Sequence, residues 1–321
     1  MDCSSCATPC ETSSQITRSR RIQVLQHDES GARACVGGAN KKWQKPKAQL
    51  WEPLCTRFPV NRHEGSPTTI LRDYCHAAIV AQSSRIVKKL NVINDLARLK
   101  YEYARRAHDP RYRDWYSPFN RANIFITQER DRAIAQMLAQ HIPRDWNVLR
   151  ILDVGCGRGN ELVKFLGYGV RERNLFGVDL LGDRVRAGRE KFSALQFACG
   201  NAATLPYPDG AFDLVLQFTV FTSILDDDLR RRIASEMLRA LDPRGAILWY
   251  DYWLNPTNPQ TRGIEKSEIK TLFPHCDYHW QRVTLAPPLA RLVAPRSWFA
   301  CEMLNQLSFL RTHWLALISK K

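Results

Sequence analysis

The residues with the clearest chemical potential stand in one glycine-rich run, Asp153-Val-Gly-Cys-Gly-Arg-Gly159, which follows an apolar segment. Glycine reaches positive φ without strain and has no Cβ, so a strand can turn tightly into a helix and a ligand can lie against the backbone. The first N–H groups of such a helix also lack intrahelical partners and can donate to a ligand. The run therefore predicts a small-molecule site at the end of a strand.

The spacing of these glycines indicates which ligand the site would hold. A dinucleotide loop of the form G-x-G-x-x-G would need glycine at position 160, but Asn160 stands there and the third glycine is Gly159. The carboxylate of Asp153 would repel a pyrophosphate, whereas it suits the ammonium group of S-adenosylmethionine (SAM). Asp179 stands 20 residues after Gly159, where a strand-end carboxylate can accept hydrogen bonds from both ribose hydroxyls. Taken alone, Asp179 could equally be an ordinary strand-end aspartate.

Apolar runs of strand length alternate with amphipathic segments through the second half of the chain. Such alternation predicts a parallel sheet with helices on both faces. The expected strands cover residues 148–154, 175–180, 195–199, 212–217 and 245–252, and the expected helices cover residues 160–168, 183–192 and 228–241. Two further strands, 278–285 and 312–319, enclose a helical insertion at about 288–310, so the last strand can enter the sheet antiparallel. We therefore expect an α/β fold with a Rossmann-like, doubly wound, seven-stranded and mostly parallel sheet.

The first part of the chain divides into two segments of different character. Residues 1–83 mix polar and basic residues without a sustained period, a composition typical of poorly structured extensions. Apolar residues then recur at spacings of three and four, which predicts a helical cap at 84–145 with a break at Asp109-Pro110 and a second helix at 123–141. The ligand-binding domain would follow at 146–321.

Composition limits the partners and the location of the protein. The chain of 321 residues carries 47 Lys and Arg against 32 Asp and Glu, a net charge of +15 that is spread along the sequence. This charge permits binding to nucleic acid or anionic lipid, but no recognisable RNA-binding module accompanies it. No apolar stretch of about 18 residues occurs, and residues 1–15 lack the apolar core of a secretory signal, so we expect a cytoplasmic protein. Cys3, Cys6 and Cys10 lack a second pair at zinc-site spacing, so no metal is expected.

Several segments together resemble the class I SAM-dependent methyltransferases, and within them the type 11 group that includes ubiquinone and menaquinone methylases. These segments are 151–160, 176–180, 200–205, 208–221 and 237–252. The resemblance implies SAM as the cofactor and says little about the acceptor. It also implies that the methionine end of SAM lies on the glycine-loop residues Asp153, Gly155, Cys156, Gly157 and Gly159.

The same resemblance implies contacts for the rest of the cofactor. Asp179 would hold the ribose and Leu180 would lie against the adenine. Asn201 and Ala202 stand where the family often has Asp-Ala beside the adenine amino group, so Asn201 is a departure that can still form a hydrogen bond. At the end of the fourth strand, beside the reactive methyl group, the resemblance places Gln217 and Phe218.

The acceptor and any general base are less clearly indicated. Asp251 and Tyr252 follow the fifth strand and are our candidate catalytic residues, while His275 and His279 are weaker candidates. A base is needed only if the acceptor must lose a proton. We expect the cap, at about residues 101–140, and the insertion 288–310 to determine the small-molecule acceptor. The insertion is either an amphipathic helix that covers the sheet or a lid for an acceptor that is apolar or anionic and lipid- or glycan-linked.

Two alternative functions remain open. An RNA methyltransferase would fit the charge, although the fourth strand lacks the Asn/Asp-Pro-Pro-Tyr motif of amino-group methylases on nucleic acids. A catalytically inactive SAM-binding adaptor would fit the cofactor motifs alone. Tyr116 and Gln128 are guesses for acceptor contacts from the cap, because the resemblance does not cover them.

Overall fold

The computed structural model describes residues 95–142, 144–255 and 258–321. The prediction for residues 1–83, the first part of the predicted cap and the cysteines Cys3, Cys6 and Cys10 lie outside the described residues. No helix in the described ranges is long and apolar enough to cross a bilayer.

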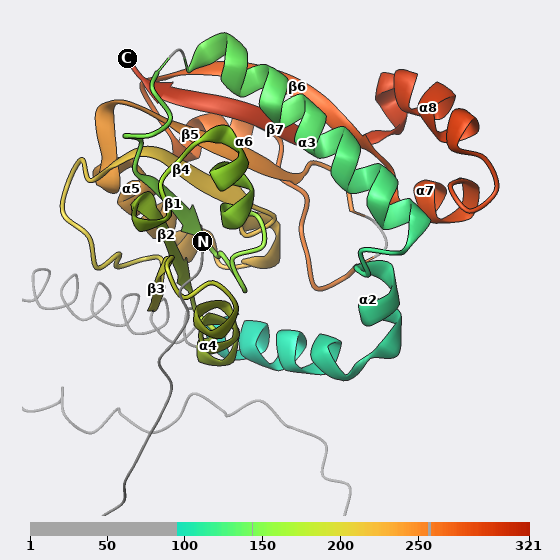
Figure 1. Cartoon of the computed structure of the whole chain (residues 1–321), viewed down its shortest axis with the longest axis horizontal. Coiled ribbons are helices and arrows are strands. Elements are labelled where there is room, and N and C mark those ends of the chain that lie inside the picture. Colours follow the sequence, from blue (N-terminus) through green and yellow to red (C-terminus); the bar gives the residue numbers. More distant parts are fainter. Residues whose placement is uncertain (1–94, 143, 256–257) are drawn as a thin grey trace, which may run out of the picture. The chain divides into compact units, whose positions relative to one another are not determined.

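The core of the fold is one seven-stranded sheet with the strand order β3-β2-β1-β4-β5-β7-β6 (Figure 1). Strands β1 to β5 pair in parallel, whereas β7 runs antiparallel between β5 and β6, which confirms the predicted fold class. The order reverses between β1 and β4, and ligands of such sheets bind at the carboxyl ends of the strands beside this point. The strands are β1 (Ile151–Val154), β2 (Leu175–Asp179), β3 (Gln196–Cys199), β4 (Phe212–Phe218), β5 (Leu241–Tyr252), β6 (Cys276–Leu285) and β7 (Arg311–Lys320).

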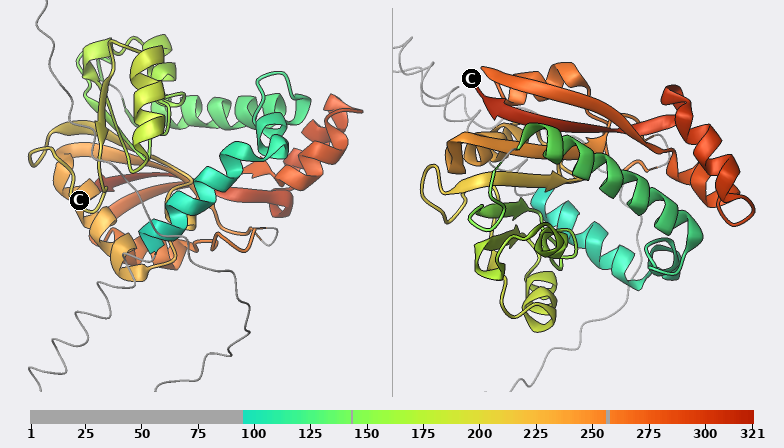
Figure 2. Two further views of the ribbon diagram at one scale, coloured as in Figure 1. Left: turned by 90° about the horizontal axis from the view of Figure 1, so that it is seen from below. Right: turned by 45° about the horizontal axis from the view of Figure 1, so that its top comes forward.

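Helices cover both faces of the sheet because strand side chains alternate between two apolar clusters. On one face, Leu152, Val215 and Ile247 pack with α5 (Asp227–Ala240) and α6 (Lys266–Leu272). On the other, Ile151, Leu214 and Leu248 pack with α3 (Arg121–His141), with α4 (Gly182–Lys191) and with the 3-10 helix Leu162–Tyr168. Figure 2 shows α3 lying across its face of the sheet.

The cap is built from three helical segments. Residues 95–108 are helical up to the predicted break, where the Asp109 carboxylate accepts from the Arg111 N–H at 3.0 Å and Pro110 opens α2 (Pro110–Trp115). Helix α3 then begins after Asn120, whose side chain accepts from the N–H groups of Ala122 and Asn123. Helices α2 and α6 were not predicted from the sequence, because six and seven residues give too few turns for an apolar period to appear.

The predicted insertion before the last strand is a pair of short helices, α7 (Pro287–Val293) and α8 (Trp298–Gln306), followed by the 3-10 turn Ser308–Leu310. It packs against the start of α3. Phe125 meets Trp298 edge-to-face with ring centroids 5.2 Å apart, and the Arg121 guanidinium donates to the Pro295 carbonyl at 3.1 Å. We call this pair with its turn, residues 287–310, the helical hairpin.

A substitution of one buried aromatic side chain tests the packing of helices α5 and α6 against the sheet. Phe273 is fully buried, with ring centroids 5.8 Å from Trp249 and 6.3 Å from Phe221. The substitution Phe273→Ala should lower the free energy of unfolding by about 3–5 kcal/mol, because the cavity it leaves cannot close fully. The control Phe309→Ala removes a ring that is 68% exposed and should change stability by about 0.5 kcal/mol or less. Equal losses in urea unfolding of the two variants would contradict this packing.

Candidate functional site

The glycine loop after β1 has the backbone conformation that its sequence predicts. Gly155, Gly157 and Gly159 all have positive φ, at 78°, 56° and 79°. A Cβ at Gly155 would lie 2.4 Å from Val220, and one at Gly159 would lie 2.6 Å from the Phe197 ring. A Cβ at Gly157 would meet nothing closer than the Arg184 guanidinium at 3.7 Å. The fold itself therefore requires Gly155 and Gly159, whereas Gly157 leaves open space over its backbone.

Asp179 fixes this loop to the end of β2. Its carboxylate accepts from the Gly157 N–H and from the Leu181 N–H, each at 2.8 Å. The side chain is 8% exposed. An ionised carboxylate can accept about four hydrogen bonds, so Asp179 keeps acceptor capacity for a ligand beside Gly157.

Asp153, the last polar residue before the loop, is buried without a protein partner. Its side chain is 2% exposed and forms no hydrogen bond or ion pair within the part of the chain that the structure describes. Burial raises its pKa well above the ordinary aspartate value, and the nearby carboxylates of Glu161 and Asp179 raise it further. An unpaired carboxylate is costly to bury, and a bound cationic group would remove that cost. The site is therefore shaped for a ligand with positive charge.

The other predicted cofactor contacts lie around the loop in different ways. Cys156 turns its side chain into the core beside Gly177, and burial raises the pKa of its thiol, so only its backbone can face a ligand. The Asn201 side-chain oxygen accepts from the Ala203 N–H at 3.0 Å. Its amide NH₂ forms no hydrogen bond to any described residue. Leu180 and Ala202 are half-buried at the ends of β2 and just after β3.

Asp251, near the carboxyl end of β5, is 1% exposed and contacts Gln217 near the carboxyl end of β4. One of its oxygens accepts from the Thr222 hydroxyl at 2.6 Å and the Tyr252 N–H at 2.9 Å, and the other from the Thr222 N–H at 3.2 Å and the Gln217 amide at 3.3 Å. Burial raises the pKa of Asp251 to about 6, although these four bonds act in the opposite direction. Asp251 thus holds Gln217 and Thr222 in place, with all its acceptor positions occupied.

An aromatic group on the α3 face of the sheet lies beside these strand ends. The Arg130 guanidinium lies 5.6 Å from the Phe218 ring centroid and 5.5 Å from that of Tyr250, and it pairs with Glu161 at 2.7 Å. His313 stacks on the Tyr250 ring at 4.6 Å and on that of Tyr252 at 3.8 Å. Burial lowers the pKa of His313 well below its ordinary value, and the charge of Arg130 lowers it further, so this imidazole is neutral.

Arg130 and His313 were not predicted from the sequence as residues of the site, although the position of Arg130 could have indicated it. Arg130 stands four residues before Ile134 and seven before Met137 on the buried side of α3, an unusual position for a charge. His313 sits in an apolar strand, where a lone histidine gives no comparable indication. Their partners come from distant parts of the chain, so only the fold reveals them.

The cap reaches the site at two points. Tyr103 from the helical segment 95–108 lies 4.3 Å from the Arg184 guanidinium, which approaches Gly157. Tyr116, after α2, is 63% exposed, yet the protein around it raises its pKa while Arg291 opposes the rise. Tyr116 also contributes to raising the pKa of Tyr252. Gln128 lies exposed on α3, on the side turned away from the sheet.

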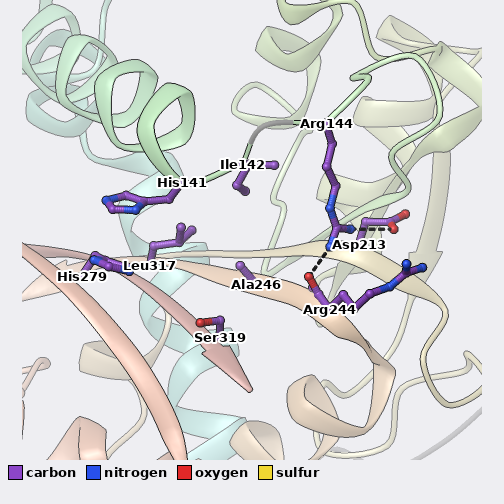
Figure 3. Close-up of a pocket in the computed structure, with 10 residues that line it drawn as sticks. His141, Ile142, Arg144, Asp213, Arg244, Ala246, His279, Leu317 and Ser319 are labelled. Atoms are coloured by element: carbon purple, nitrogen blue, oxygen red, sulfur yellow. Dashed lines mark hydrogen bonds and ion pairs between the residues drawn. The ribbon is translucent and has the colours of Figure 1, made fainter. Parts of the chain in front are cut away.

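The weaker histidine candidates lie elsewhere. His279 stacks on His141 at 3.7 Å and lines a small cavity at the amino-terminal ends of β4 and β5, with Arg144, Asp213 and Arg244 (Figure 3). This is the sheet edge opposite to the glycine loop, because parallel strands end together. His275 is exposed at the start of β6. The structure therefore brings Asp251 and Tyr252 to the site and separates both histidines from it.

Comparisons with known proteins identify the domain that carries this loop. A family model described as a methyltransferase domain matches residues 151–245. Norajmaline N-methyltransferase of Rauvolfia serpentina is 31% identical over 134 residues, which cover 40% of this chain and 44% of that protein. Sterol 24-C-methyltransferase ERG6B of Gibberella zeae is 31% identical over 186 residues, which cover 55% of this chain and 47% of that protein.

Each match covers only part of the chain. The chain spans less than half the length of these two curated relatives. Among solved structures, the PH0226 protein of Pyrococcus horikoshii OT3 is 17% identical with a TM-score of 0.48, covering 68% of this chain and 99% of that one. The names of the curated relatives share methyl transfer and differ in the acceptor. Residues 151–245 of the chain therefore form a methyltransferase domain.

Proposed function

We propose that this protein transfers a methyl group from SAM to a small-molecule acceptor and releases S-adenosylhomocysteine. The observation that carries the proposal is the buried, unpartnered carboxyl of Asp153 beside the open backbone of Gly157. SAM carries a net positive charge, whereas dinucleotides are anionic, and the negative charge of Asp179 near Asp153 attracts the former and repels the latter. The two curated relatives named above, an N- and a C-methyltransferase, support the same chemistry.

The residues around the loop suit each part of this cofactor. Asp153 would receive the ammonium group and Asp179 the ribose hydroxyls, in addition to the two backbone N–H groups it already binds. Leu180 and Ala202 offer apolar contact for the adenine, and the amide group of Asn201 offers a hydrogen bond. When bound, SAM supplies a methyl group on a sulfonium leaving group, so the protein needs mainly to position the acceptor and exclude water.

The acceptor would lie at the carboxyl ends of β4 and β5. Phe218, Tyr252 and Tyr116 present aromatic surface there, and the neutral imidazole of His313 supports Tyr252 from below. The Asp251 carboxyl already accepts four hydrogen bonds, whereas the Tyr252 hydroxyl forms none to a described residue. Tyr252 is therefore the better placed of the two candidate catalytic residues to contact the acceptor. Asp251 would act by position, because its carboxylate fixes Thr222 and Gln217 beside the reacting centre.

The reaction can be tested directly on the full chain. The purified protein would be incubated with methyl-labelled SAM and a fractionated cell extract. Label in a small-molecule fraction supports the proposal. Label only in RNA would assign an RNA methyltransferase, and tight SAM binding without label in any fraction would indicate an inactive SAM-binding protein.

Two glycine-to-alanine substitutions test the proposed cofactor site. Gly157→Ala should weaken SAM binding at least tenfold in calorimetry, because its Cβ would occupy the open space over the loop. The matched control is Gly210→Ala. Gly210 also has a positive φ, of 64°, and a Cβ there would meet nothing closer than 3.9 Å, at Asp242 and Pro243. Both variants should lose about 1–2 kcal/mol of stability from backbone strain, but only Gly157→Ala should lose the cofactor. Equal SAM affinities in the two variants would place the cofactor elsewhere.

The raised pKa of Asp251 gives a pH-dependent prediction. The folded state holds the Asp251 proton up to about pH 6, whereas the unfolded chain releases it near pH 4, so raising the pH through this window destabilises the folded state. The stability of the wild type relative to Asp251→Asn should therefore fall by about 3 kcal/mol between pH 4 and pH 7. Urea unfolding at several pH values measures it, with Asp277→Asn, an exposed carboxyl on β6, as control.

The same variant separates position from proton transfer. If Asp251 only positions its neighbours, Asp251→Asn lowers turnover and leaves the shape of the pH–rate profile unchanged. Loss of an ascending limb near pH 6 in the variant would instead make Asp251 the general base.

A further inference from the structure

The exposed side of the helical hairpin is unusually apolar. Helix α8 buries Cys301 and Asn305 against the rest of the fold, which accounts for one side of the helix. Phe299 and Met303, four residues apart on the opposite side, are 74% and 54% exposed. A helix that is apolar on both sides normally has both sides covered. Within the described residues, nothing covers this side of α8.

Further exposed apolar side chains lie on the hairpin and on the cap. Three further large side chains are mostly exposed: Leu292 on α7, Phe309 in the turn after α8, and Phe119 between α2 and α3. Figures 1 and 2 show α7 and α8 projecting from the end of the sheet beside the start of α3. Several large exposed apolar side chains on neighbouring elements are typical of an interaction site.

Arginines without acidic partners flank this surface. Residues 110–121 and 287–310 contain five arginines and only two acidic residues. Arg111 is paired with Asp109, but no ion pair to a described residue is formed by the other four, Arg113, Arg121, Arg291 and Arg296. Contacts within the hairpin or between the hairpin and the cap hold three of these in place. Arg121 donates to the Pro295 carbonyl, Arg296 donates to the Leu292 carbonyl, and Arg291 lies 4.3 Å from the centroid of the Trp115 ring on α2.

We propose that this apolar and basic surface docks the protein on an anionic lipid membrane. Phenylalanine, leucine and methionine side chains would enter the boundary between head groups and acyl chains, while the four arginines would meet lipid phosphates. A second copy of the chain fits less well, because a two-fold contact would bring both copies' unpaired arginines into one interface with few acidic residues to balance them. The surface lies outside the cofactor loop, so membrane docking does not depend on methyl transfer.

Vesicle binding of the full-length chain tests this surface. The protein should co-sediment with vesicles of phosphatidylcholine mixed with phosphatidylglycerol and much less with phosphatidylcholine alone, and added salt should weaken the binding. The double variant Phe299→Ser with Met303→Ser should lower the partition coefficient about tenfold or more. Arg296→Glu should lower it at least about fivefold on the anionic vesicles. Val148→Ser, which changes a 60% exposed valine before β1, is the matched control and should bind as the wild type does.

Three results would overturn the proposal. One is the absence of binding to anionic vesicles, and another is equal binding by the wild type, the double variant and Arg296→Glu. The third is light scattering that shows a wild-type dimer and a monomeric double variant, which would assign the surface to a second copy. Calorimetry with SAM, done on each variant, separates this question from the cofactor site. Unchanged SAM binding alongside lost vesicle binding shows an intact fold and a specific surface effect.

Discussion

The glycine loop is held against the end of β2 by one carboxylate, which accepts the N–H groups of Gly157 and Leu181. These bonds require the chain to fold back tightly after β1, and that bend requires three residues at positive φ. Gly177 in β2 meets the same constraint from the other side, because a Cβ there would lie 2.7 Å from the Cys156 sulfur. The loop, the strand end and the open backbone at Gly157 therefore form a single unit, which is where we propose that the cofactor binds.

Charge within this unit is unevenly compensated, and that imbalance favours a cationic ligand. Glu161 follows the loop and has a partner, since it pairs with the buried guanidinium of Arg130 at 2.7 Å. Asp153 lies on the same face of the sheet and has no such partner among the described residues. Lys164 also pairs with Glu161, at 2.9 Å, so Glu161 is compensated and Asp153 is left for the ligand. Because Asp153 is buried, a contact with an ammonium group there would be stronger than the same contact in water.

The fold could be predicted from sequence wherever an apolar run was long enough to show its period. Strand β2 was expected at 175–180 and is found at Leu175–Asp179, and β7 was expected at 312–319 and is found at Arg311–Lys320. The loop was predictable because each glycine answers a local backbone demand. The group around Arg130 and His313 was not, because its contacts join α3 to β4, β5 and β7 across the chain. No local pattern encodes contacts of that kind, and only the folded sheet brings them together.

Helix α3 relates the cofactor side to the exposed hairpin through adjacent residues. Arg130 points toward the sheet and pairs with Glu161, while Glu129 accepts a hydrogen bond from Asn305 of α8. Phe125, one turn earlier, is fully buried against Trp298 at the start of α8. The hairpin is thus anchored to the helix that also fixes the charge beside the glycine loop. A substitution between α3 and α8 therefore affects both the glycine loop and the helical hairpin. Phe299 and Met303 instead point away from α3, so they can contact a partner without disturbing the proposed cofactor site.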